Sequence, residues 1–169
     1  MKKAQEAEFD KIFWSEKDKV YFTALKHLKS PQDAEEIVQE VFLKVFLALP
    51  KFQYKSLLST WIYRIALNEI YSCFRKEGKK KKVELQDQHS STYPLPEEVL
   101  EQKDMDRLLK KWISQMPKKR GKVLFLRIFE NLSFKEIGEV VSVSENSAKS
   151  LFSLGLKELK NKNKEVSYE

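Results

Sequence analysis

Aromatic and cationic side chains alternate between positions 51 and 76 in a pattern suited to binding chemistry. The rings are Phe52, Tyr54, Trp61, Tyr63, Tyr71 and Phe74, and the cations are Lys51, Lys55, Arg64, Arg75 and Lys76. Rings beside a basic track can capture unpaired nucleic-acid bases, at roughly 1–3 kcal/mol per stacked base. Because large aromatic side chains also fill protein cores, we expect about half of these rings to be buried.

An acidic group lies just upstream. Asp33, Glu36, Gln39 and Glu40 recur at spacings of three or four residues, which places them on one face of a helix. Such a face could dock on a basic partner by charge complementarity. Taken alone, a solvated helix face is the more common explanation of the pattern.

Polar residues near the C-terminal end form a third group. Two short helices joined by a tight turn are predicted here, and polar side chains at the start of the second could reach base edges in a major groove. The group comprises Ser133, Lys135, Ser144, Glu145, Asn146, Ser147, Lys149, Ser150 and Ser153. A helical hairpin that only packs is the alternative for this pattern in isolation.

Catalytic and metal motifs are not recognisable in the sequence. It has two histidines, His27 and His89, one cysteine, Cys73, and no glycine-rich phosphate loop. The histidines and the cysteine do not have the spacing of a zinc site, and no partnering ligand motif accompanies the carboxylates. We therefore expect no enzymatic activity, no cofactor and no bound metal.

The elements that must position these groups are predicted to be helices. Apolar residues recur at helical spacing, without sustained alternation, and only four glycines and five prolines interrupt them. Ser30 is expected to cap a helix that starts at Pro31, while Ser133 and Ser144 are expected to cap two later ones. The predicted helices cover residues 9–28, 31–49, 60–74, 99–116, 123–129, 134–141 and 145–159. The fold class is therefore all-α.

Composition divides the chain into two small helical domains. Residues 1–78 and 104–169 are predicted to fold, and residues 79–103, with a basic run and few apolar side chains, to form a flexible linker. The net charge of +7 favours a polyanionic partner. One cysteine, no export signal and no apolar run of membrane-spanning length predict a cytoplasmic protein without membrane insertion.

Three segments, in this order, resemble the extracytoplasmic function sigma factors of the sigma-70 family. SPQDAEEIVQEVFLKVFLALPKF is similar to the segment that docks on the clamp coiled coil of RNA polymerase. STWIYRIALNEIYSCFRK is similar to the promoter-melting helix, and MPKKRGKVLFLRIFENLSFKEIGEVVSVSENSAKSLFSLGLKEL to the domain that reads the −35 element. The resemblance implies a transcription initiation factor with two helical domains.

The resemblance also assigns roles to residues. Docking on core polymerase falls to Asp33, Glu36, Gln39 and Glu40, and the polymerase flap is a further expected contact. Contact with the −10 element falls to Lys51, Phe52, Gln53, Tyr54, Lys55, Ser56, Arg64, Asn68, Arg75 and Lys76. Contact with the −35 element falls to the nine polar residues of the third group, and promoter DNA is thus the second expected partner.

Two departures from the family pattern stand out. Leu151, Leu154, Leu156 and Glu158 occupy positions where cations are usual, so we expect weak phosphate binding and a shallow salt dependence. The surplus apolar surface suggests an anti-sigma factor or a recruiting protein as a partner. The second departure is Ser72, which stands where the family usually has Asp; no direction of effect follows from it.

Two other readings remain open. A conventional helix-turn-helix regulator would bind an operator as a dimer and would not open DNA. A sigma-like protein that depends on a recruiting partner, or that occupies polymerase without initiating, would also carry these segments. The succession of acidic helix, aromatic–basic loop and further amphipathic helix favours the sigma factor.

Overall fold

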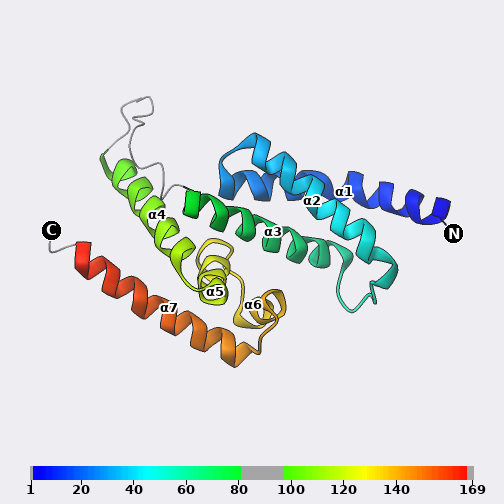
Figure 1. Cartoon of the computed structure of the whole chain (residues 1–169). Helices are drawn as coiled ribbons and strands as arrows, with labels where there is room; N and C mark the ends of the chain where they lie inside the picture. Colours follow the sequence, from blue (N-terminus) through cyan, green and yellow to red (C-terminus); the bar gives the residue numbers. More distant parts are fainter. Residues whose placement is uncertain (1, 81–96, 167–169) are drawn as a thin grey trace. The chain divides into compact units, whose positions relative to one another are not determined.

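The computed structural model describes residues 2–80 and 97–166, and the side chains of residues 6–78 and 105–164. Every regular element in these residues is a helix, which confirms the all-α prediction (Figure 1). The elements are α1 (Lys2–Leu28), α2 (Pro31–Ala48), the short 3-10 helix η1 (Leu49–Lys51), α3 (Leu58–Lys80), α4 (Glu97–Gln115), α5 (Lys118–Phe129), α6 (Phe134–Val141) and α7 (Glu145–Val166).

Backbone packing divides the chain into two compact units, Met1–Phe74 and Arg75–Glu169. Residues 81–96, which contain most of the predicted linker, lie outside the described residues. Residues 97–103, also assigned to the linker from the sequence, are the first turns of α4. The predicted domain boundaries stay a prediction.

The first unit is built on a helical hairpin of α1 and α2 (Figure 1). Rings from the two helices interlock, with centroid distances of 5.1 Å for Phe9 and Phe46 and 4.9 Å for Phe13 and Phe42. Such edge-on ring pairs contribute about 0.5–1.5 kcal/mol beyond their buried area. As predicted, Ser30 caps α2, because its Oγ accepts a hydrogen bond of 3.2 Å from the Asp33 N–H.

Helix α3 completes the first unit. Its buried side chains recur at spacings of three and four residues, the period of a core-facing helix: Ile62, Ala66, Leu67, Ile70, Tyr71 and Phe74. An ion pair of 2.6 Å between Lys44 Nζ and Glu69 Oε1 ties α2 to α3. The burial of Tyr71 and Phe74 agrees with the expectation that part of the aromatic series is core.

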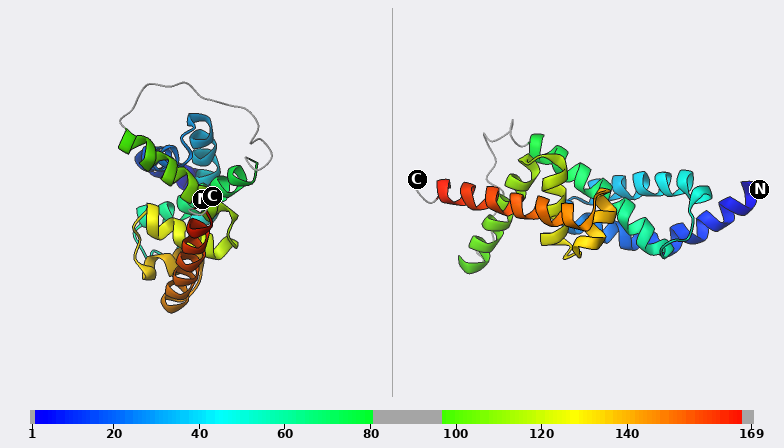
Figure 2. Two further views of the ribbon diagram at one scale, coloured as in Figure 1. Left: turned by 90° about the vertical axis from the view of Figure 1, so that its left-hand side faces the viewer. Right: turned by 90° about the horizontal axis from the view of Figure 1, so that it is seen from below.

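In the second unit, α5 and α6 both pack on α7 (Figure 2). Val123, Leu124, Phe125 and Leu126 are fully buried, with Ile137 from α6 and Ala148 from α7. Gly155 lets α7 approach α5, since a Cβ there would collide with the side chain of Leu124. The unit is thus a helix-turn-helix, α6 and α7, supported on α5.

Several helices are longer than the sequence predicted. Helix α1 begins at Lys2 instead of residue 9, α5 at Lys118 instead of residue 123, and α7 ends at Val166 instead of residue 159. The added turns are rich in charged residues, as in KKR at the start of α5. Apolar periodicity registers only the turns that face a core, so solvated turns escape it.

Candidate functional site

The acidic face predicted on α2 is present in the structure. Ala34, Ile37, Val41 and Val45 are buried, and Glu36, Gln39 and Glu40 are exposed on the other side of the helix. Asp33 is half-buried, next to the capped end. Three of the four predicted docking side chains are therefore fully available to a partner.

Two leucines extend this face and were missed from the sequence. Leu43 is 55% exposed and Leu47 67% exposed. They follow Glu36 and Glu40 at spacings of three and four residues, so the four side chains form one stripe along α2. We call residues 36, 40, 43 and 47 the α2 stripe. The spacing could have revealed it, because Leu43 and Leu47 fall outside the buried series.

Three aromatic rings meet where the loop after η1 leads into α3. Phe52 stacks on Trp61 at a centroid distance of 4.6 Å and meets Tyr54 in a tilted geometry at 4.8 Å. Phe52 and Trp61 are half-buried, whereas Tyr54 is 69% exposed. Gln53 and Lys55 are exposed beside it, and Ser56 is half-buried. The loop thus offers a ring at its surface next to a cation.

Tyr54 is held in an unusual conformation. Its φ is +52°, a region that disfavours bulky residues. Its hydroxyl donates a long hydrogen bond of 3.4 Å to Glu8 Oε1 on α1. Spacing along the chain could not predict this contact, because Glu8 lies 46 residues away.

The other residues predicted for the −10 element continue from the loop along α3. Arg64, Asn68 and Arg75 share one stripe of the helix with Trp61 and Ser72, which were not predicted to make this contact, because the five follow at spacings of three or four residues. All five are half-buried, and Lys76 is exposed. Lys51 is exposed at the end of η1. Rings and cations thus alternate from the loop along α3.

Ser72, at the position where the family usually has Asp, bonds to its own helix. Its hydroxyl donates to the carbonyl of Asn68 over 2.9 Å. This bond uses the serine's only donor. The stripe therefore carries a neutral side chain at position 72, and its hydroxyl proton is already hydrogen-bonded.

In the second unit, both predicted caps are present. Ser133 and Glu136 form a capping box: the Glu136 N–H donates to Ser133 Oγ over 3.3 Å, and the Ser133 N–H donates to Glu136 Oε2 over 2.8 Å. Ser144 Oγ accepts from the Ser147 N–H over 3.1 Å at the start of α7. These caps fix where each helix begins.

The tight turn between the two helices depends on a close approach. A Cβ on Gly138 would lie 2.7 Å from the carbonyl oxygen of Val143. Ser142 ends α6 with φ of +58°, a left-handed conformation that usually calls for glycine. The turn packs α7 against α6 and leaves Glu145, Asn146 and Lys149 exposed on its first turns.

Several hydroxyls predicted to contact DNA are engaged inside the fold. The Ser144 hydroxyl donates to Ser147 Oγ over 2.8 Å, and the Ser150 hydroxyl donates to the carbonyl of Asn146 over 3.0 Å. Asn146, Lys149 and Ser153 have exposed side chains on α7, and Lys135 is exposed on α6. The nine predicted residues thus lie on α6 with its cap, on α7 and in the turn between them. Some of their hydroxyl donors already form hydrogen bonds within the chain.

An ion pair sits on the first turns of α7. Lys149 Nζ lies 2.8 Å from Glu145 Oε1. The hydrogen bond and positive charge of Lys149 lower the pKa of the Glu145 carboxyl from its ordinary value of 4.5, and the charge of Lys135 adds to this. Glu145 therefore remains ionised at neutral pH.

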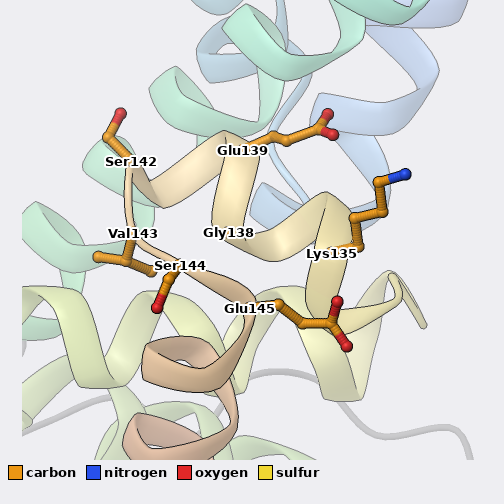
Figure 3. A pocket seen from close by; sticks show the side chains of 7 residues that line it. All are labelled: Lys135, Gly138, Glu139, Ser142, Val143, Ser144 and Glu145. Atoms are coloured by element: carbon orange, nitrogen blue, oxygen red, sulfur yellow. The ribbon is translucent and has the colours of Figure 1, made fainter.

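An open hollow of about 490 Å³ lies against the turn. Its lining is Lys135, Gly138, Glu139, Ser142, Val143, Ser144 and Glu145. In the view of Figure 3, the side chains of Lys135, Glu139 and Glu145 project to the same side of the two helices. The hollow is shallow and bordered by charges, as suits a macromolecular edge better than an enclosed small molecule.

The unusual residues of α7 have distinct environments. Leu154 is 51% exposed, whereas Leu151 and Leu156 are half-buried. Glu158 pairs with Arg120 of α5, with 2.8 Å between Oε2 and Nη1. The carboxylate at this expected cation position thus ties α7 to α5, and only one of the three leucines is widely exposed.

Within the described residues, no group of three or more His, Cys, Asp or Glu side chains is arranged to hold a metal ion. None of the helices described is both long and apolar enough to cross a bilayer.

Comparison with known proteins matches both units to one family. Residues 13–80 match Sigma-70 region 2, and residues 106–159 match Sigma-70, region 4. The chain is 26% identical over 170 residues to the ECF RNA polymerase sigma factor SigW of Bacillus subtilis (strain 168), covering 95% of this chain and 91% of SigW. It is 28% identical over 148 residues to the RNA polymerase sigma factor SigZ of the same organism, covering 87% of this chain and 82% of SigZ.

A solved structure shares the fold. The sigma factor RpoE of Bartonella quintana, in complex with the anti-sigma factor NepR, superposes with a TM-score of 0.52 at 19% identity. The match covers 91% of this chain and 95% of RpoE. With both conserved regions present in order, this chain belongs to the sigma-70 family of RNA polymerase sigma factors, in its extracytoplasmic function group.

Proposed function

We propose that this chain binds core RNA polymerase, directs it to particular promoters and helps to melt the −10 region, without catalytic activity of its own. One observation carries the proposal. An exposed acidic helix face, an aromatic–basic loop leading into a polar stripe, and a helix-turn-helix follow one another in a chain that matches Sigma-70 regions 2 and 4. Docking, strand opening and upstream recognition can then each be assigned to one of these three surfaces.

Docking on the polymerase falls to the acidic face. Glu36, Gln39 and Glu40 are exposed acceptors that can meet cations on the clamp coiled coil. Leu43 and Leu47 continue the face and can bury apolar surface, at about 25 cal/mol per Å². Charge would steer the encounter, and the leucines would slow dissociation.

Strand opening falls to the loop and the α3 stripe. A base that leaves the duplex loses stacking, and the exposed Tyr54 ring offers a replacement beside Lys55. Arg64 and Asn68 lie along the helix that follows, where a single strand could be held by its backbone. One guanidinium nitrogen of Arg75 already donates to the carbonyl of Met116 over 2.9 Å. Capture of the unpaired state shifts the duplex equilibrium toward opening.

Upstream recognition falls to the helix-turn-helix. The first turns of α7 present Glu145, Asn146 and Lys149 for insertion into a major groove, with Lys135 of α6 placed for phosphate. A protein with these roles works where the polymerase does, so we propose a cytoplasmic location. The polymerase supplies the chemistry of nucleotide addition.

The exposure of Leu154 favours a second form of this function, in which a protein partner takes part. Leu154 is exposed in the middle of α7, where no cation stands between Lys149 and Lys157, and Glu158 is engaged with Arg120. We propose that a protein partner covers this surface, either an anti-sigma factor or a recruiting protein that helps to choose the promoter. Replacing Leu154 and Leu156 by Lys should then weaken partner binding; unchanged binding would exclude this second form.

The test is transcription in vitro by core polymerase on fragmented DNA of the source organism, with and without the chain. New, discrete RNA start sites are expected. Binding to core without new starts would favour dependence on a recruiting partner. Failure to bind core would favour a conventional helix-turn-helix regulator instead.

A further inference from the structure

The ion pair of Glu145 and Lys149 is the most distinctive charged feature at the tip of the helix-turn-helix. Both side chains are about half exposed, 49% for Glu145 and 52% for Lys149, and their charged atoms are 2.8 Å apart. An exposed pair between residues four apart on one helix adds little to stability. The pair lies just behind the Ser144 cap, on the part of a recognition helix that reaches base edges.

The two side chains present opposite chemistry side by side. An ionised carboxylate only accepts hydrogen bonds, and an ammonium group only donates them. In the major groove, cytosine offers the N4 amino donor, and its partner guanine offers the O6 and N7 acceptors. An acceptor next to a donor on the protein thus matches a donor next to an acceptor on a C·G pair.

An A·T pair fits less well. Its amino donor, adenine N6, lies between two acceptors, adenine N7 and thymine O4. A carboxylate placed on N6 would therefore face an acceptor on each side. The cytosine amino group has an acceptor on one side only, and this is the side where the Lys149 ammonium can lie.

The surroundings keep the pair ready for this contact. Lys135 of α6 adds its positive charge beside the same carboxylate, and with Glu139, which lines the same hollow, the four charges sum to zero. The hydroxyls of Ser144 and Ser150 are engaged within the helix. Glu145 lines the open hollow at the turn, where it is accessible (Figure 3).

We propose that Glu145 and Lys149 together recognise one C·G base pair of the upstream promoter element, with the carboxylate on cytosine N4 and the ammonium on guanine. The inference rests on the proposed function, because it requires the second unit to contact promoter DNA. It adds a specificity-determining pair to that function.

The test uses holoenzyme assembled from core polymerase and the full chain, with a promoter library randomised in the upstream element. Wild type should enrich cytosine at one position by about tenfold over other bases. Glu145→Gln should shift the preference at this position toward adenine, because an amide pairs with adenine N6 and N7. Lys149→Met should weaken selection at the same base pair. Glu139→Gln removes the same charge from the same hollow and should leave the preference unchanged.

Three results would overturn the inference. Glu145→Gln could leave every base preference unaltered, could raise binding equally on all sequences, or could alter a position where wild type prefers A·T. In each case the holoenzyme still selects promoters, so the proposed function stands. If wild-type holoenzyme selected no upstream sequence, both the inference and upstream recognition by this chain would fail.

Discussion

The two surfaces proposed to bind DNA differ in how far their polar side chains take part in the fold. In the first unit, Gln53, Tyr54 and Lys55 project from a loop that is held by the stacking of Phe52 on Trp61. In the second unit, Ser133 and Ser144 cap the two helices of the helix-turn-helix, and Glu145 pairs with Lys149. In the first unit, Phe52 and the Tyr54 hydroxyl take part in the fold, whereas Gln53 and Lys55, also proposed to bind DNA, only project from the loop. The second unit uses many of the same groups for folding and for binding.

This difference has a consequence for mutagenesis. Substitutions on the exposed surfaces of the first unit should alter function and leave stability nearly unchanged, since exposed side chains far from packing or caps have small effects. Substitutions around the turn of the second unit should alter stability and DNA binding together.

The largest effect is expected on the α2 stripe. Replacing Glu36 and Glu40 together by Lys should weaken core binding by about 3 kcal/mol, roughly a hundredfold, because like charges would then oppose each other across the interface. Fluorescence anisotropy with core polymerase measures it. The double variant Asp10→Lys and Asp18→Lys makes the same charge change on exposed residues of α1 and should bind nearly normally. Equal losses in both variants would show that net charge, and not this face, governs docking.

The next effect concerns Tyr54. Tyr54→Ala should reduce open-complex formation by about 2 kcal/mol, some thirtyfold, through loss of one stacked base. The fluorescence of 2-aminopurine in the −10 element reports it, and the thermal midpoint of the chain should hardly change. Phe22→Ala removes an aromatic ring of similar exposure, 64% against 69%, from α1. If Phe22→Ala slowed opening as much, the loop would have no special role in strand capture.

A smaller effect, now on stability, is expected at Gly138. Gly138→Ala should destabilise the chain by about 1–2 kcal/mol, because the new methyl group meets the Val143 carbonyl and the backbone must move. Thermal or urea unfolding measures it, and binding to upstream promoter DNA should fall in parallel. A variant of full stability but weakened DNA binding would contradict the overlap of folding and binding at the turn.

The smallest effect concerns the protonation of Glu145. Lys149→Met should raise the pKa of Glu145 back toward 4.5, since Lys149 is the main cause of its lowering. The lowered pKa stabilises the folded chain above the unfolded pKa, and this contribution is lost as the pH falls through the folded pKa. Titration of the Glu145 side-chain carboxyl by NMR follows the shift. A pKa that did not move would show that the ion pair is not formed in solution.

The sequence predicted the parts of these surfaces that arise from local rules. The start of α2 follows from Ser30 and Pro31, the start of α6 from Ser133, and the acidic face from a spacing of three or four residues. These features depend on neighbours within one helical turn, so a single sequence contains them.

Other parts depend on contacts between distant residues, which spacing does not encode. The bond from Tyr54 to Glu8 spans 46 residues, and the pair of Arg120 and Glu158 spans 38. The sequence shows Glu158 only as a carboxylate where a cation was expected. The structure adds that this carboxylate pairs with Arg120 of α5.

The proposed function depends above all on the first unit, which should capture unpaired promoter bases once core polymerase is bound. Permanganate reactivity of thymines, in a complex of promoter DNA, core polymerase and the full chain, tests it most directly. We predict reactive thymines in the −10 element that require the chain and are much reduced with Tyr54→Ala. A complex that protects the upstream element but leaves the −10 thymines unreactive would contradict the account.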